Sequence, residues 1–162
     1  MNRRNDTLLL IAEIQKAVAQ IHRIAAYHKE FRTDFPSGQT HKQYDLVILA
    51  DIVTDYYTCL ETAFVRISRF FENNLEKDRW HKHLLEKMTL EIPGIRRAVL
   101  SDECYHQLEE FLRFRDFKRY YYDYNYDRDK MLFLEKKLME SIPLVARDLG
   151  QFIEFLSELS KA

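Results

Sequence analysis

The stretch HKQYDLVILADIVTDYYTCLETAFVRISRFFEN, residues 41–73, is the most strongly patterned part of the chain. Its large apolar side chains recur every three or four residues, which is the spacing of one face of an α-helix. The members of this stripe are Ile48, Ile52, Tyr56, Leu60, Phe64, Ile67 and Phe71. The stretch contains neither glycine nor proline, so nothing within it signals a helix end. We therefore expect one long helix that is buried along one side.

Working outward, the same spacing predicts further helices at about 7–31, 78–92, 101–122 and 127–162. Proline and glycine occur together in the loops expected at 35–38 and 92–94. Asp78 is a plausible N-cap for the third helix, and Pro143 should kink or briefly interrupt the last one.

The composition favours the same fold class. Only three glycines and three prolines occur among 162 residues, too few for the turns of a β-sandwich or for a glycine-rich phosphate loop. No linker divides the chain. The sequence therefore predicts an all-α protein, with residues 1–162 forming a single domain that is one antiparallel bundle of about five helices.

Net charge and cysteine content set limits on location and partners. The formal net charge is −1, so no global field draws the protein to nucleic acid or to a membrane. No apolar run approaches the roughly 18 residues of a membrane span, and the run at 8–12 is short for a signal peptide. Cys59 and Cys104 are too few for a disulfide framework. We expect reduced thiols in a cytoplasmic protein that does not associate with membranes.

The expected helix at 101–122 carries a core stripe that continues into polar residues. At about 100° per residue, one side of it presents Cys104, Leu108, Phe111, Arg115 and Tyr122. Burying an arginine without a partner is costly. One interpretation is a recessed anion site, in which Arg115 and Arg119 hold a phosphate. The other is structural: Arg115 pairs with Asp116 or Glu109, or extends to solvent.

A second aromatic row lies on another side of this helix. It consists of Phe114, Phe117, Tyr121 and Tyr124. Such a row indicates a partner surface, unless the helix is central and buried on two sides. Both interpretations stay open.

The same region is locally basic. Residues 113–122 contain four cations and one anion, and tyrosines interleave with them. Arg113, Lys118 and Arg119 are therefore candidate ligands for phosphate, with neighbouring rings available for base stacking. Tyrosine-rich segments also serve packing and interfaces.

The sequence predicts neither a metal site nor a cofactor. His81 and His83 are two residues apart, which points them to different sides of a helix, and Cys104 and His106 lack a second ligand pair. The sequence has no Walker loop, dinucleotide fingerprint or Gly-x-Ser-x-Gly motif.

Several short motifs occur together in the central third of the chain. They are Trp80-His81 with Leu84-Leu85 and Met88, then Leu90-Glu91-Ile92-Pro93-Gly94-Ile95-Arg96, Ala98-Val99-Leu100-Ser101 and Arg113-Phe114-Arg115. They resemble the HepT-like family: HEPN ribonuclease toxins that are paired with minimal nucleotidyltransferase (MNT) antitoxins. The resemblance extends over roughly residues 45–160.

This resemblance implies a HEPN helical fold and RNA cleavage without a metal ion. The family motif is Arg, four residues, His, one residue, Tyr, near the end of a helix. Arg115 matches the Arg and Tyr122 the final Tyr, while Tyr120 stands at the His position. Arg115 and Tyr120 are thus the candidate catalytic residues, at the scissile phosphate and the 2′-hydroxyl. Tyrosine is a poorer base than histidine near neutral pH, and Asp116 stands where a second histidine is common.

The resemblance also implies partners. Family members form homodimers that bring two motif helices together around a cleft, and in some the nucleotidyltransferase transfers AMP to the motif tyrosine, here Tyr122. The leading hypothesis is the toxin-side subunit of a HEPN–MNT pair that cleaves RNA. The second is a degenerate HEPN homodimer that binds RNA, a nucleotide or the nucleotidyltransferase without cleaving, and the third is a structural helical module. Tyr120 is the discriminating residue.

Overall fold

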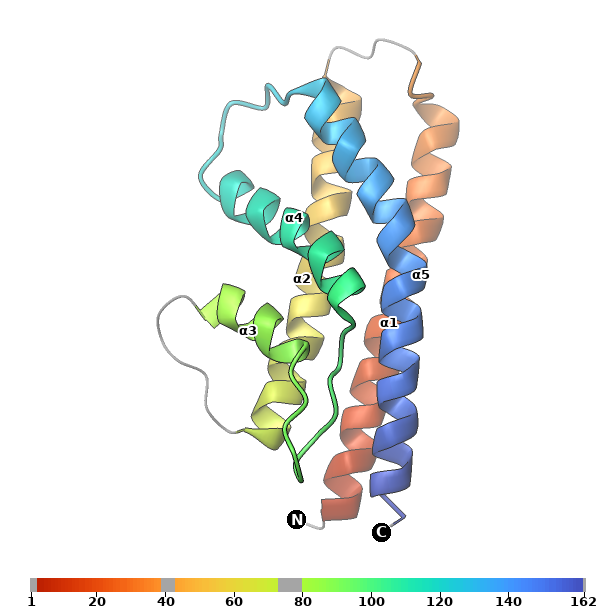
Figure 1. The fold of residues 1–162 in the computed structure, drawn as a ribbon. Coiled ribbons are helices and arrows are strands. Elements are labelled where there is room, and N and C mark those ends of the chain that lie inside the picture. Colours follow the sequence, from red (N-terminus) through yellow and green to blue (C-terminus); the bar gives the residue numbers. More distant parts are fainter. Residues whose placement is uncertain (1–2, 39–42, 73–79, 162) are drawn as a thin grey trace.

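The computed structural model describes residues 3–38, 43–72 and 80–161, with the side chains of residues 80–82 outside that description. Within these ranges the chain forms five helices (Figure 1): α1 (Arg3–Asp34), α2 (Tyr44–Phe71), α3 (Trp80–Met88), α4 (Asp102–Lys118) and α5 (Arg128–Leu159). The predicted all-α bundle of five helices is confirmed. The helix start expected near Asp78 lies outside the described residues.

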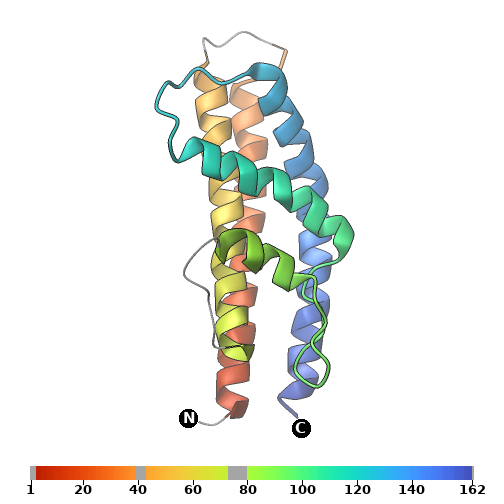
Figure 2. The same ribbon diagram turned by 60° about the vertical axis from the view of Figure 1, so that its left-hand side comes forward.

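Three long helices make the body of the bundle. α1 lies against α2 and α5 and runs opposite to both, so the first and last helical turns of the chain lie at the same end (Figures 1 and 2). α4 crosses α2 and α5 obliquely, and the short α3 packs against α2 and α4. This arrangement presents the C-terminal end of α4 beside the outer side of α2.

The core is built from the stripes that the sequence predicts. Along α2 the buried members of the predicted stripe are Ile52, Tyr56, Leu60, Phe64 and Ile67, and the partly buried ones are Ile48 and Phe71. Tyr56 also packs edge-on against Phe111 of α4, with ring centroids 5.5 Å apart. Its hydroxyl shares a hydrogen bond of 2.9 Å with Ser141 of α5. One residue of α2 thus ties together the helices that position the site.

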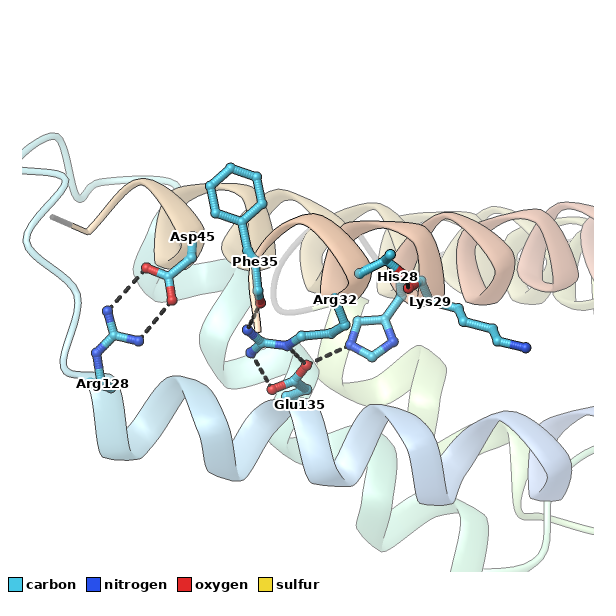
Figure 3. Close-up of polar contacts among 8 residues, drawn as sticks. His28, Lys29, Arg32, Phe35, Asp45, Arg128 and Glu135 are labelled. Carbon is cyan, nitrogen blue, oxygen red and sulfur yellow. Dashed lines mark hydrogen bonds and ion pairs between the residues drawn. The ribbon is translucent and has the colours of Figure 1, made fainter. Parts of the chain in front are cut away.

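Partly buried ion pairs join the long helices at one end of the bundle (Figure 3). Glu135 of α5 accepts two hydrogen bonds from the Arg32 guanidinium and one of 2.6 Å from His28 Nε2, both on α1. Asp45, at the start of α2, accepts two from Arg128 at 2.7 and 3.0 Å. Burial alone would raise the pKa of Glu135, but the hydrogen bonds from His28 and Arg32 outweigh it and lower that pKa to about 2.

Pro143 does not interrupt the last helix, which is one of the two outcomes expected from the sequence. α5 is helical on both sides of it, and its axis changes direction along its length (Figure 1), as a proline that removes one backbone donor and crowds the preceding turn favours. Cys104 is buried and Cys59 half-buried, and neither forms a disulfide in the described part of the chain. Of the helices in the described ranges, none has the length and apolarity required to cross a bilayer.

Candidate functional site

The N-terminal end of α4 is anchored on α5. Ser101 Oγ accepts a hydrogen bond from the Cys104 backbone at 3.2 Å, which caps the helix. Asp148 of α5 in turn accepts hydrogen bonds from the Ser101 backbone at 2.8 Å and from its hydroxyl at 2.7 Å. The apolar stripe below, including Leu108 and Phe111, is fully buried. α4 is therefore held in a fixed position before its cationic end begins.

α4 ends at Lys118, earlier than the expected 122. The chain turns because its own aromatic side chains close the loop: Tyr121 stacks on Phe117 with centroids 4.6 Å apart, and its hydroxyl donates to Asn125 O at 2.6 Å. Tyr124 adopts a positive φ of 55° in this turn. The prediction that Tyr122 continues the Arg115 stripe is therefore wrong, since Tyr122 lies in the loop.

The second aromatic row is also altered by this loop. Phe114 is buried, and its ring lies 6.1 Å from the buried ring of Tyr126. Tyr121 packs between Phe117 and Tyr126, so only Phe117 and Tyr124 are exposed. Much of the row is thus occupied within the chain, in line with the alternative that α4 is buried on two sides.

Arg115 is oriented by two carboxylates and a ring. Its guanidinium donates to Glu61 of α2, which is buried, and to Asp116 Oδ1 at 3.1 Å. The same guanidinium lies over the buried ring of Tyr57, 5.4 Å from the centroid. Burial and the nearby charge of Glu61 raise the pKa of Tyr57, so its hydroxyl stays protonated. Asp116 was one of the two partners expected from the sequence.

Glu109, the other expected partner, is used elsewhere. It accepts a hydrogen bond of 3.0 Å from the Tyr105 hydroxyl and lies 3.6 Å from Arg113. Arg113 also donates to Glu110 at 2.8 Å. Arg113 therefore belongs to a carboxylate-rich surface of α4 and does not line the same hollow as Arg115.

Three cations at the end of α4 line one hollow against α2. This α2–α4 hollow has a volume of about 430 Å³ and is lined by Thr54, Thr58, Arg115, Lys118 and Arg119. Lys118 pairs with Asp51, at its edge. Arg119 has no carboxylate partner among the described residues, and its guanidinium lies 5.8 Å from the Tyr120 ring centroid. Cations beside hydroxyl groups are the donors that a phosphate accepts from.

The tyrosines of the motif lie outside the hollow, in the loop that follows α4. Tyr120 is 73% exposed and Tyr122 is 76% exposed. Both phenol rings are therefore accessible from solvent, next to the cationic end of the helix. No three His, Cys, Asp or Glu side chains converge on a common point within the described ranges, and the side chain of His81 lies outside them.

Sequence reasoning missed the contribution of α2. Thr54, Thr58 and Glu61 recur at helical spacing on one side of it, a polar row beside an otherwise apolar stripe. That row is the signal that could have indicated a facing cation. It could not identify Arg115, which is 54 positions from Glu61 in the chain.

The fold and the site together define an all-α domain with a cationic, hydroxyl-lined hollow at the end of a motif helix. A family model described as HepT-like protein matches residues 48–156, which include α3, α4 and most of α2 and α5. The chain belongs to the HepT-like family. Comparisons with curated proteins and with solved structures give no significant match.

Proposed function

We propose that this chain is the toxin-side subunit of a HEPN–MNT pair, and that it engages RNA in the cytoplasm with a phosphate seated in the α2–α4 hollow. Membership of the HepT-like family supports the class of protein. Arg115 matches the arginine of the family motif, and Tyr120 stands where the motif has its histidine. Lys118 and Arg119 supply further positive charge.

The observation that carries this proposal is the convergence of Arg115, Lys118 and Arg119 on one hollow that Thr54 and Thr58 also line. Each of these cations attracts an anion more strongly where water is partly excluded from the site. Arg119 has the most to gain, because no described carboxylate neutralises it. Thr58 is exposed on the opposite wall, where its hydroxyl can donate to a phosphate oxygen.

A second candidate function, RNA or nucleotide binding without cleavage, is favoured by a specific contact. Glu61 and Asp116 both occupy the guanidinium of Arg115, which reduces its net pull on a phosphate. Tyr120 stands where the family has a proton-transferring histidine. We expect low or absent cleavage by the natural chain for these two reasons.

The exposed position of Tyr122 suits the modification that the family implies. We propose that the partner nucleotidyltransferase adds AMP there: the Tyr122 oxygen attacks the α-phosphorus of ATP, pyrophosphate leaves, and the phenolic proton passes to the partner or to water. The expected homodimer would place two such loops near one cleft. Phe117 and Tyr124, the exposed members of the aromatic row, are the candidate contacts between the two copies.

Cleavage of a labelled single-stranded RNA, with and without chelator, tests the proposal. Tyr120→His restores an imidazole at the motif position and should increase cleavage. The matched control, Tyr44→His, adds the same group at an exposed tyrosine at the start of α2 and should not. Arg115→Ala should remove any cleavage and weaken binding, because the phosphate loses a charge partner.

The possible results separate the two candidate functions. A gain only in Tyr120→His, lost again with Arg115→Ala, supports the site and the binding-only state of the natural chain. Cleavage by the natural chain that Arg115→Ala abolishes supports the ribonuclease. Strong cleavage that is indifferent to Arg115→Ala contradicts both and places the chemistry elsewhere.

A further inference from the structure

A groove between α1 and α2 lies next to the α2–α4 hollow. It has a volume of about 500 Å³, and its rim carries Arg23 and Tyr27 of α1 and Asp51 and Asp55 of α2. This volume falls within the range of small-molecule sites. None of these four residues belongs to the family motif, and the proposed function does not use the groove.

The groove and the hollow share the outer face of α2. At about 100° per residue, Asp51 lies about 20° around the helix from Thr58 of the hollow and about 40° from Asp55 of the groove. Asp51 lines the groove and also pairs with Lys118, which lines the hollow. Lys118 therefore reaches the ridge between the two. A ligand with its phosphate at Lys118 can extend over this ridge into the groove.

The groove has an apolar floor made by Ile24, Ile48 and Ile52. Ile24 and Ile52 are buried and Ile48 is partly buried. The Tyr27 ring above them is 54% exposed. A flat heterocycle gains from both features, because it removes apolar surface from water and stacks on the ring.

The charged side chains on the rim determine which hydrogen-bonding groups the edge of a bound heterocycle must carry. Asp55 has no hydrogen-bond or ion-pair partner among the described residues, and two carboxylates on one wall repel a second phosphate. On the α1 wall Arg23 is bonded only to Gln20, at 3.3 Å, within the same described ranges. The α2 wall thus offers hydrogen-bond acceptors, and the α1 wall offers hydrogen-bond donors.

We propose that the α1–α2 groove is a guanine subsite of the phosphate site, an inference that rests on the proposed function. Guanine carries two adjacent donors, N1–H and the N2 amino group, which match one carboxylate. Its O6 and N7 acceptors match an arginine. Adenine and cytosine offer an amino group next to an acceptor. Uracil presents two carbonyl oxygens beside its one N–H, which the carboxylates repel.

Calorimetric titration of the full chain with GMP, AMP, CMP, UMP and inorganic phosphate tests this inference. GMP should bind at least about tenfold more tightly than UMP, the discrimination of one good bidentate contact. Asp55→Asn should reduce that ratio below about threefold, because it weakens GMP and relieves the repulsion of the uracil carbonyl oxygens in UMP. Tyr27→Leu should weaken all four nucleotides and leave inorganic phosphate unchanged. Asp129→Asn, an exposed carboxylate in the first turn of α5, is the control and should change nothing.

The outcomes distinguish this subsite from the function on which it rests. If all four nucleotides bind equally and Lys118→Ala weakens each of them, the phosphate site stands and the guanine subsite is refuted. If Asp55→Asn leaves the GMP preference intact, the subsite is refuted as well. If neither nucleotides nor RNA bind at all, the proposed function and the subsite both fail.

Discussion

Glu61→Gln should make the protein less stable and a better phosphate binder at the same time. Glu61 is buried and holds Arg115, whose side chain is 14% exposed. Removing one partner of a buried ion pair costs about 3–5 kcal/mol. Glutamine keeps an oxygen that can accept the hydrogen bond, so we expect about 2 kcal/mol here. That loss corresponds to a fall in Tm of about 4–8 °C for a domain of this size.

The gain in affinity follows from Coulomb's law. A phosphate seated about 6 Å from the Glu61 carboxylate, at an effective dielectric constant of about 40, loses a repulsion of about 1.4 kcal/mol. Binding of a short RNA should therefore strengthen about tenfold. Stability is measured by urea denaturation, and affinity by fluorescence anisotropy at low salt, where charge interactions are least screened.

Asp116→Asn is the matched control, because it removes the other carboxylate on Arg115 from an exposed position. Its stability should change by less than about 0.5 kcal/mol, while RNA binding should still strengthen. A Glu61→Gln protein with unchanged RNA affinity would contradict the assignment of Arg115 to a phosphate site. Unchanged stability would contradict the buried ion pair.

Three further predictions concern other parts of the molecule. The pKa of Glu135 is lowered from 4.5 to about 2, so its contribution of about 3 kcal/mol is present above pH 4.5 and lost as the pH falls toward 2. In urea denaturation, the free energy of unfolding of Glu135→Gln should therefore fall less between pH 4.5 and 2 than that of the natural chain. Glu140→Gln, which removes a carboxylate from an exposed pair, should lose as much as the natural chain. An equally steep loss in both variants would contradict the cluster of Glu135 with His28 and Arg32. Sedimentation at micromolar concentration should give a particle of two chains, and a single-chain particle throughout would remove the basis for a two-motif cleft. Incubation with the nucleotidyltransferase and ATP should label the natural chain and not Tyr122→Phe, and AMP retained by that variant would place the modification elsewhere.

The helices were predictable from sequence because each buries one periodic face. Ile52, Leu60 and Phe64 lie in the core at the positions that the spacing indicates. The end of α4 was not predictable in the same way. The apolar and cationic pattern continues to Tyr122, but the Phe117–Tyr121 stack and the Tyr121 hydrogen bond favour a closed loop over another helical turn.

The site was predictable in part. The sequence indicates that Arg115 needs an anion, and the spacing brings Arg119 within one turn of it. The identity of the buried partner depends on how α4 crosses α2, which is a tertiary feature without a local signal. The sequence therefore could not indicate that Arg115 pairs with Glu61 and not with Glu109. Nor could it indicate that Arg113 pairs with Glu109, away from the hollow.

The salt dependence of RNA binding tests the α2–α4 hollow most directly. The natural chain is compared with a Lys118→Ala/Arg119→Ala double variant and with Lys161→Ala, an exposed cation just after the end of α5. Each phosphate contact on a single strand contributes about −0.7 to the slope of log K against log salt. The double variant should bind more weakly at low salt and lose about 0.7–1.4 of that slope, while Lys161→Ala matches the natural chain. Equal slopes and affinities for all three proteins would contradict the hollow as the phosphate site.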